Sequence, residues 1–367
     1  AAIALASEGL PRARRPIVFG LVGAAAEAGA VLGPLYGGII IELLGWRWIF
    51  WTNLPVVAVL LAVLVAVPES HGSRGKLDIA GGLLLAGGLS LVTVALAQKT
   101  LFAVDSPAPY GAAAAGVALL VTLIVVESKA AEPVFQRTLF LARSFAAAMS
   151  AQFLIGTALI LALVTVPLMA DTVLGQSPLE GGLRLMRFTG AIPVGAVLGG
   201  FAVRRLGVRP PIFVGLALGA GGLLLMGTWD ATIADPEMSL HLVVGGLGFG
   251  LVIAPLVVSA LDTATDDYRG TAAAWITVSR MLGMTLGLAA LSAWGMDQFQ
   301  GLTADLPFPL PTAGESNAAF SARVDAYEAG VTGASFEVFQ AFFRAGAGLT
   351  LAAAVPAFFL PNRQTVH

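Results

Sequence analysis

Residues 17–44 read IVFGLVGAAAEAGAVLGPLYGGIIIELL, and their only charged side chains are Glu27 and Glu42. A helix needs about 20 apolar residues to cross the hydrocarbon core of a bilayer, which is roughly 30 Å thick. Glycine stripes let neighbouring helices approach to backbone contact, and a proline inside a helix kinks it. The stretch therefore predicts a close-packed, kinked membrane span that suits a hinge or a gate. At 100° per residue it carries two stripes: Gly29, Gly33 and Gly37 on one, and Gly20, Gly23, Glu27, Pro34 and Gly38 on the other.

The composition of the whole chain indicates an integral membrane protein. Hydrophobic residues make up 57% of the 367 residues before the 44 glycines are counted, whereas soluble domains reach about 45–50% with glycine included. Charged residues make up 11%, where about 25% is usual. A soluble protein of this size would have too few ionic groups to cover its surface.

Several function classes are excluded by the same counts. The net charge of -2 offers no basic field for nucleic acid. The absence of cysteine removes disulfides, thiolate nucleophiles and cysteine-bound metals, and the three histidines are scattered along the chain. No Gly-x4-Gly-Lys-Ser/Thr phosphate loop is present, and no constellation of catalytic side chains stands out. We expect no metal, no cofactor and no enzymatic activity.

Apolar stretches long enough to span a membrane recur along the chain. Because backbone groups in lipid must bond within their own segment, and the stretches lack the alternation of a β-barrel strand, each is predicted to be helical. The fold class is therefore an all-α membrane bundle with ten transmembrane helices. The predicted spans are 17–44, 49–67, 79–98, 110–126, 144–170, 179–202, 208–228, 239–261, 270–296 and 341–360.

The distribution of lysine and arginine predicts the orientation of these spans. Cytoplasmic loops carry an excess of positive residues, and alternate loops here hold most of the 20 that the chain contains. Both ends of the chain are then cytoplasmic, in a multi-pass protein of the cytoplasmic membrane. The longest connection, 297–340, is then external, and it is either a lid or a loop without a function of its own. Within it, residues 318–329 are predicted to form a short surface helix. The residues that mark the cytoplasm are Arg12, Arg14, Arg15, Arg74, Lys76, Lys129, Arg137, Arg143, Arg204, Arg205, Arg209, Arg269 and Arg363.

A weak internal repeat links the two ends of the chain. A shift of 254 residues places Arg15 on Arg269, and Gly29 and Gly33 on Gly283 and Gly287. Parallel repeats of helix bundles are a transporter architecture, although two glycine-rich spans can also align by chance. The shared arginine and orientation favour the repeat.

The glycine stretch carries a family resemblance. Gly23-x5-Gly29-x3-Gly33-Pro34-x2-Gly37-Gly38 resembles the antiporter motif in the fifth span of the 14-span drug:proton antiporters, which belong to the major facilitator superfamily. The following stretch, 45–55, reads GWRWIFWTNLP and is similar to that family's signature between spans five and six.

The resemblance implies a division of the chain. Residues 1–68 would be the remnant of the first six-helix half, 69–136 a two-helix insertion, and 137–361 the second six-helix half with the external loop 297–340. Residues 362–367 would be a cytoplasmic tail. Four further spans, with the proton-coupling acid and arginine of the family, are expected upstream.

A second stretch is similar to the family's cytoplasmic loop motif. It comprises Gly200, Arg204, Arg205, Gly207 and Arg209, but Arg204 stands where the family has an aspartate. Val208 replaces an arginine of the motif in the same way. A charge-relay role and a plain basic turn therefore both stay open.

Two ionisable residues are predicted to lie deep in the membrane, where such groups are costly and usually functional. Glu27 lies about 15 Å along its span, and Arg280 lies at a similar depth in the repeat-related span. Glu27 is a candidate proton or cation site, or else a buried structural carboxylate. Arg280 is a candidate for an anionic ligand or for a structural ion pair. Candidate cavity aromatics, for which ordinary packing is the competing interpretation, are Phe153, Phe188, Phe249 and Trp275.

With the resemblance included, the sequence predicts a monomeric, proton-coupled exporter of hydrophobic or cationic small molecules, including antibiotics. It would work by alternating access, with the proton gradient as its energy source and the lipid bilayer and its substrate as its partners. The alternatives are a uniporter or importer of a polar metabolite on the same fold, and a non-transporting membrane sensor.

Overall fold

A computed structural model of the chain describes residues 14–65, 79–96, 107–127, 137–265, 268–311 and 316–361. The described residues form helices and turns, with no strand among them. The helices are α2 (Arg15–Leu44), α3 (Arg47–Val65), α4 (Ile79–Leu96), α6 (Ala108–Glu127), α7 (Arg137–Phe140), α8 (Arg143–Thr172), α9 (Pro178–Leu206), α10 (Arg209–Met226), α11 (Glu237–Thr263), α12 (Arg269–Thr303), α13 (Asn317–Ala352) and α14 (Ala354–Ala357).

The apolar helices confirm an all-α membrane protein. Within the described part of the chain, seven helices are long and apolar enough to cross a membrane, namely α6 and α8 to α13. Three shorter apolar helices accompany them, at Ile17–Ala26, Arg47–Val63 and Ala80–Leu96. Each of the ten predicted stretches coincides with a helix, but the count of ten spans stays a prediction.

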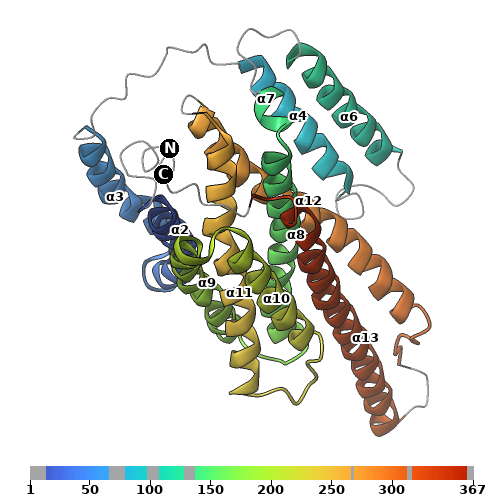
Figure 1. The fold of residues 1–367 in the computed structure, drawn as a ribbon. Coiled ribbons are helices and arrows are strands. Elements are labelled where there is room, and N and C mark those ends of the chain that lie inside the picture. The colour runs from blue at the N-terminus through green and yellow to red at the C-terminus, as the bar shows by residue number, and fades with distance from the viewer. Residues whose placement is uncertain are drawn as a thin grey trace.

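The six long helices α8 to α13 gather into one bundle, which we call the main lobe (Figure 1). Its centre is α11, which packs along α9 on one side and α10 on the other. On the other side of the lobe, α8 packs along α12, and α13 lies against both α8 and α10. Of the spanning helices α11 is the most deeply buried, whereas few residues of α12 are buried.

Glycine allows these helices to touch at their backbones. A Cβ atom added at Gly246 would overlap the carbonyl of Phe188 on α9, and one at Gly248 would overlap the backbone of Gly219 on α10. The α8–α12 pair uses the same device, because a Cβ at Gly283 would overlap the carbonyl of Phe153. Small residues at a membrane helix interface permit close approach, which gives dispersion contacts that lipid does not replace. Their positions therefore fix which helices become neighbours.

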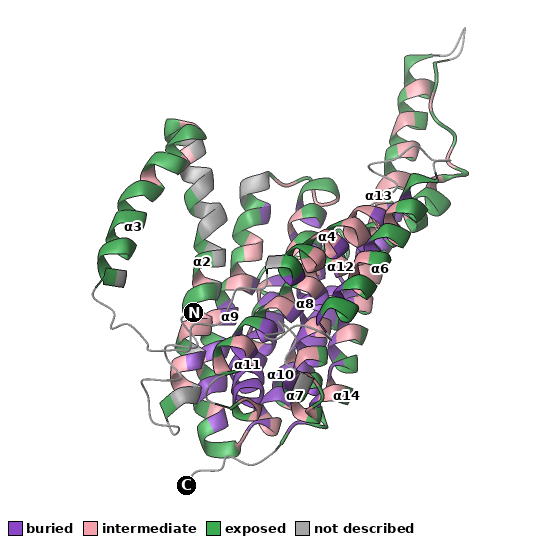
Figure 2. Ribbon diagram, turned by 90° about the horizontal axis from the view of Figure 1, so that it is seen from above, coloured by how far each residue is buried: buried purple, intermediate pink, exposed green. Residues whose placement is uncertain are grey.

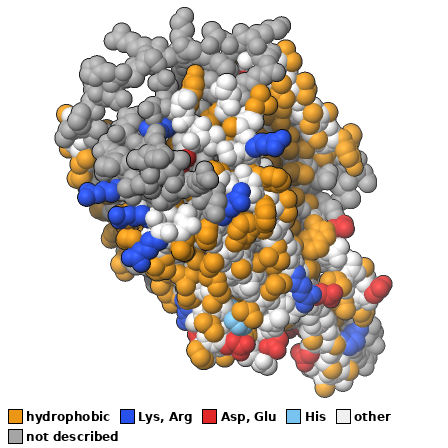
Figure 3. All heavy atoms as spheres, viewed as in Figure 1, with side chains coloured by type: hydrophobic (Ala, Val, Ile, Leu, Met, Phe, Trp, Pro, Cys, Tyr) orange, Lys and Arg blue, Asp and Glu red, His pale blue; other side chains and the backbone are white. Residues whose placement is uncertain are grey.

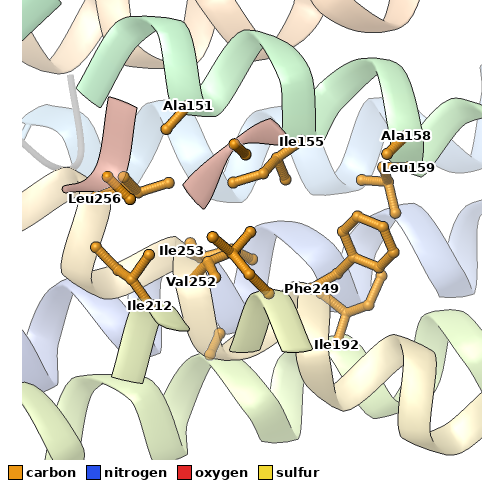
Figure 4. Packing of buried hydrophobic residues seen from close by; sticks show 14 of the residues in the cluster. Ala151, Ile155, Ala158, Leu159, Ile192, Ile212, Phe249, Val252, Ile253 and Leu256 are labelled. Atoms are coloured by element: carbon orange, nitrogen blue, oxygen red, sulfur yellow. The ribbon is translucent and has the colours of Figure 1, made fainter. Parts of the chain in front are cut away.

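The core between these backbones is apolar. Phe249 of α11 points into the space between Leu159 of α8 and Ile192 of α9 (Figure 4). Its ring also meets that of Phe188 edge to face, with centroids 5.8 Å apart. Large, closely packed apolar side chains therefore fill the middle of the main lobe.

The predicted external segment 297–340 differs from expectation. Helix α12 continues to Thr303 and α13 begins at Asn317, so that only 304–316 connects them. The predicted short helix at 318–329 is wrong as a separate element, because it is the first part of α13. With 35 and 36 residues the two helices are about 50 Å long, so their joined ends project beyond the other helices (Figure 1). Phe308 packs on Tyr327 at 5.5 Å, and Arg323 donates to the carbonyl of Leu310 at 2.8 Å.

The remaining helices lie around the main lobe. Helix α2 packs on α9 and α11, whereas α3 contacts α2 and is exposed along most of its length (Figure 2). Helices α4 and α6 form a hairpin, in which Gly88 and Gly116 lie at the contact, and α4 reaches α12. The two-helix insertion predicted for 69–136 contains this hairpin, although the division into halves stays a prediction.

Adjacent glycines on α10 provide a test of backbone contact. We expect Gly222→Ala to destabilise the protein by about 1–3 kcal/mol, because its Cβ would overlap Gly245 of α11. Gly221→Ala is the matched control, since Gly221 has open space within 4 Å, and alanine there favours the helix by about 0.5–1 kcal/mol. Thermal unfolding in detergent measures both, and equal midpoints for the two variants would contradict the packing.

Candidate functional site

The glycine stretch of α2 lies against the main lobe. A Cβ atom at Gly23 would come within 2.9 Å of Ile253 Cγ2 on α11, whereas Gly29 has open space around it. The surroundings of Gly33, Pro34, Gly37 and Gly38, and the side chain of Glu27, lie outside the described residues. Close packing is thus observed at one glycine, and the gating role of the stretch stays a prediction.

A cavity of about 550 Å³ lies between α12, α8 and α4. Its volume is within the range of small-molecule sites, about 300–1,000 Å³. Three of its residues come from α4 and α8, namely Thr93, Leu96 and Ile160. The rest form one face of α12: Met281, Met284, Thr285, Leu288, Ala289, Ser292, Ala293 and Met296.

The lining of this α12 cavity suits an uncharged ligand. Within the described part of the chain, none of its lining residues carries a charge, and its polar atoms include the hydroxyls of Thr93, Thr285 and Ser292. The three methionines are unbranched and polarizable, so they adapt to ligands of irregular shape. The hydroxyl of Thr93 donates to the carbonyl of Leu89 at 2.8 Å, while Thr285 and Ser292 are exposed side chains in the cavity wall. The site can hold an apolar body and hydrogen-bond a neutral polar group.

The predicted cavity aromatics lie elsewhere. Phe188 and Phe249 are buried in the core of the main lobe, and Trp275 is 7% exposed with its ring 5.2 Å from that of Phe140. Phe153 is half-buried at the α8–α12 contact. None of the four lines the α12 cavity, so their part in a transport route stays a prediction.

Sequence reasoning missed the residues that line the cavity, although a signal was present. Met281, Met284, Leu288, Ser292 and Met296 recur at intervals of three and four residues, which is one face of a helix. Met281 and Met296 are 44% and 43% exposed, which is high for methionine in a packed bundle. Arg280 does not line the cavity. It is half-buried, and its backbone carbonyl lies against Gly156 of α8.

The basic turn 204–209 has a structural explanation. Gly207 ends α9 with φ of 83° and ψ of -174°, a conformation that only glycine adopts readily. Gly200 is buried in α9, while Arg204 and Arg205 are exposed in its last turn. Arg209 donates from Nε to the carbonyl of Leu360 at 2.5 Å, which ties the start of α10 to the chain after α14. The geometry fits a tight basic turn, and a charge-relay role stays untested.

At the opposite end of the main lobe, the α10–α11 turn is joined to α9. Arg187 donates to Asp235 at 2.6 Å and to Ser239 at 2.7 Å, and Ser239 donates to the same carboxylate. Acidic side chains gather at this end and on the projecting ends of α12 and α13 (Figure 3). The hydrogen bond from Ser239, followed by that from Arg187, lowers the pKa of the Asp235 carboxyl.

The lowered pKa of Asp235 predicts an acid-sensitive contribution to stability. A carboxyl whose pKa is lowered by folding stabilises the protein above its ordinary pKa of about 3.9, and this stabilisation is lost as the pH falls further. We expect Asp235→Asn to cost less than about 1 kcal/mol at pH 7, because the ion pair is partly exposed. Unfolding midpoints of the variant and the parent should converge as the pH falls below about 3.9. A difference that stays constant with pH would contradict this role of the carboxylate.

The fold is a bundle of long apolar helices with an apolar cavity beside α12. The model of the Major Facilitator Superfamily matches residues 1–288, and the chain belongs to that family. Its curated relatives bear transporter names.

Three curated relatives are named as transporters of one lipid. The chain is 36% identical to a triacylglyceride transporter of Mycolicibacterium hassiacum over 331 residues, which cover 85% of this chain and 61% of the relative. It is 35% identical to a probable triacylglyceride transporter of Mycobacterium leprae, covering 84% and 64%. It is also 35% identical to a triacylglyceride transporter of Mycobacterium tuberculosis strain H37Rv, covering 84% and 63%. The chain thus spans less than two thirds of these relatives, and their names give no support to the drug-antiporter subfamily.

Proposed function

We propose that the chain belongs to a transporter of an uncharged, acyl-chain lipid such as a triacylglyceride. The observation that carries the proposal is the α12 cavity, whose described lining is apolar apart from a few hydroxyl groups. The names of the relatives support the same substrate class.

The chemistry of the cavity separates a neutral lipid from a cation. A cation that leaves water needs a paired charge, because burying an unpaired charge is costly. A neutral ester lipid needs only apolar contacts and donors for its ester carbonyls. Thr285 and Ser292 are suited to that second task, since they lie two helical turns apart on the same face of α12.

The transport cycle that we propose is alternating access in the cytoplasmic membrane. The main lobe would rock against the first lobe, to which α2 and α3 belong, with the proton gradient as the energy source and no cofactor. The packing of α2 on α9 and α11 supports this contact as the moving interface. The protein would act as a monomer with its arginine-rich end in the cytoplasm.

Filling the cavity tests the substrate class. We expect Ala293→Phe to lower the transfer of a fluorescent triacylglyceride out of proteoliposomes by about tenfold or more, because a lost apolar site of even 1.4 kcal/mol has that effect. The full-length protein is used throughout.

Ala290→Phe is the matched control for the filled cavity. Ala290 lies one turn away on the same helix, is exposed and does not line the cavity. The Ala290→Phe variant should therefore transfer the lipid at the parent rate. Parent activity in Ala293→Phe would contradict the proposed site, and loss in both variants would show a general defect of α12.

Proton-coupled efflux of hydrophobic drugs is a second candidate. It is favoured by the glycine stretch of α2 and by the approach of Gly23 to Ile253 across the α2–α11 contact. Cells that express the protein would then retain less of a neutral dye, and a protonophore would restore retention. The uncharged cavity lining favours neutral over cationic dyes in that assay.

The role of Glu27 in coupling has its own test. A carboxyl that takes up protons during transport confers a pH dependence, so Glu27→Gln should flatten the pH profile of transport between about pH 5 and 8. Uptake of labelled substrate in proteoliposomes at a series of pH values measures this. An unchanged profile in an active variant would assign Glu27 a structural role.

A further inference from the structure

A buried histidine joins the α10–α11 turn to α11, at the end of the main lobe that carries Asp235. The indole Nε1 of Trp229 donates to Nδ1 of His241 at 3.0 Å. The two residues are 2% and 6% exposed, so little water reaches this hydrogen bond.

The same tryptophan holds the turn to α13. Gln340 donates from Nε2 to the carbonyl of Trp229 at 2.8 Å, and the rings of Trp229 and Phe343 meet edge to face at 5.7 Å. Arg344 donates to the side chain of Gln340 at 3.1 Å. Trp229 is therefore an anchor that joins the turn 227–236 to both α11 and α13.

The chemistry of the two rings fixes the proton on the imidazole. An indole N–H can only donate, so Nδ1 of His241 must keep its lone pair and the ring is neutral with its proton on Nε2. That nitrogen lies 3.9 Å from the carboxylate of Glu237, whose side chain is 68% exposed. The carboxylate therefore lies on the side of the ring away from Trp229, where an imidazolium would find an opposite charge.

We propose that His241 is a proton-binding site that controls how the turn 227–236 is held. When the hydrogen bond from Trp229 opens, a proton from water can bind at the freed lone pair of Nδ1, which converts the ring to an imidazolium with two N–H donors. Nδ1 then no longer accepts from Trp229, and the positive ring is drawn to the carboxylate of Glu237. Protonation thus exchanges one partner for the other and releases the anchor of the turn.

Glu237 is the acid that faces the ring, and the other charged groups described at this end have partners of their own. On α9, Arg184 donates to Met238, and Arg187 pairs with Asp235 of the turn. Asp230, also in the turn, accepts from Thr232, and Arg344 of α13 is directed to Gln340 and Gly227. On α10, Gly222 lies near the backbone carbonyl of His241, and the residues of this helix after Arg209 are uncharged.

The consequence is an acid-sensitive end of the main lobe. A change of acidity at the face of the membrane that this turn meets would therefore change how firmly the turn is held. It lies about 27 Å from the basic turn 204–209, because the 18 residues of α10 separate them. The inference goes beyond the proposed function and does not depend on the substrate.

Hydrogen exchange of the full-length protein tests the site. Protection of the backbone amides of 227–235, corrected for the intrinsic effect of pH, should fall about tenfold between about pH 7.5 and 5.5. A tenfold change corresponds to about 1.4 kcal/mol, which is the scale of one buried hydrogen bond. Protection of the α9–α11 contact should stay constant over the same range.

Two variants separate the proposal from a general acid effect. His241→Asn keeps an acceptor at the position of Nδ1 at every pH, so its turn should stay protected at about pH 5.5. Trp229→Phe removes the donor, so its turn should be weakly protected at both pH values. A pH-independent parent, or the same loss of protection in His241→Asn as in the parent, would overturn the proposal.

Discussion

Backbone contact at glycine is the interaction on which the rest of the structure depends. Inside a bilayer the lipid tails are as apolar as the side chains, so burial alone does not select one helix neighbour over another. The order of α9, α11 and α10 is instead fixed where Gly246, Gly248 and Gly250 bring backbones together. The same device joins α8 to α12 at Gly156 and Gly283. Close packing on this side of α12 leaves its other face free for the cavity.

One face of α12 packs on α8, and its other face lines the cavity. The face of α12 that packs on α8 carries small and polar residues. There Ser279 donates to the carbonyl of Met149 at 2.7 Å, and Thr157 of α8 donates to the carbonyl of Gly283 at 3.0 Å. The other face carries the methionines and hydroxyls that line the cavity. A helix that is held firmly on one face can present flexible side chains on the other without losing its position. The α12 cavity is therefore a property of a rigid element with an adaptable surface.

Much of the fold was predictable, but little of the site was. Long apolar runs predicted every long helix, because the backbone in lipid has no alternative to helical hydrogen bonding. The ends of α12 and α13 were predicted too short, since polar residues such as Asp297 and Glu328 end an apolar run without ending a helix. Phe188 and Phe249 were plausible cavity residues from their type, yet they fill the core. Their burial depends on the rotation of α9 and α11, which periodicity in an evenly apolar helix does not define.

The sequence by itself determined that the chain is an all-helical membrane protein of the major facilitator superfamily, but not its subfamily, because composition, span length and the glycine stretch of α2 are local properties. Tertiary structure alone decided which side chains meet. The hydrogen bond between Trp229 and His241, and the gathering of Thr93, Ile160 and Met284 around one cavity, join residues from different elements. Such contacts follow from interhelical packing, whose energy is a sum over many small backbone and side-chain contacts and carries no local signature.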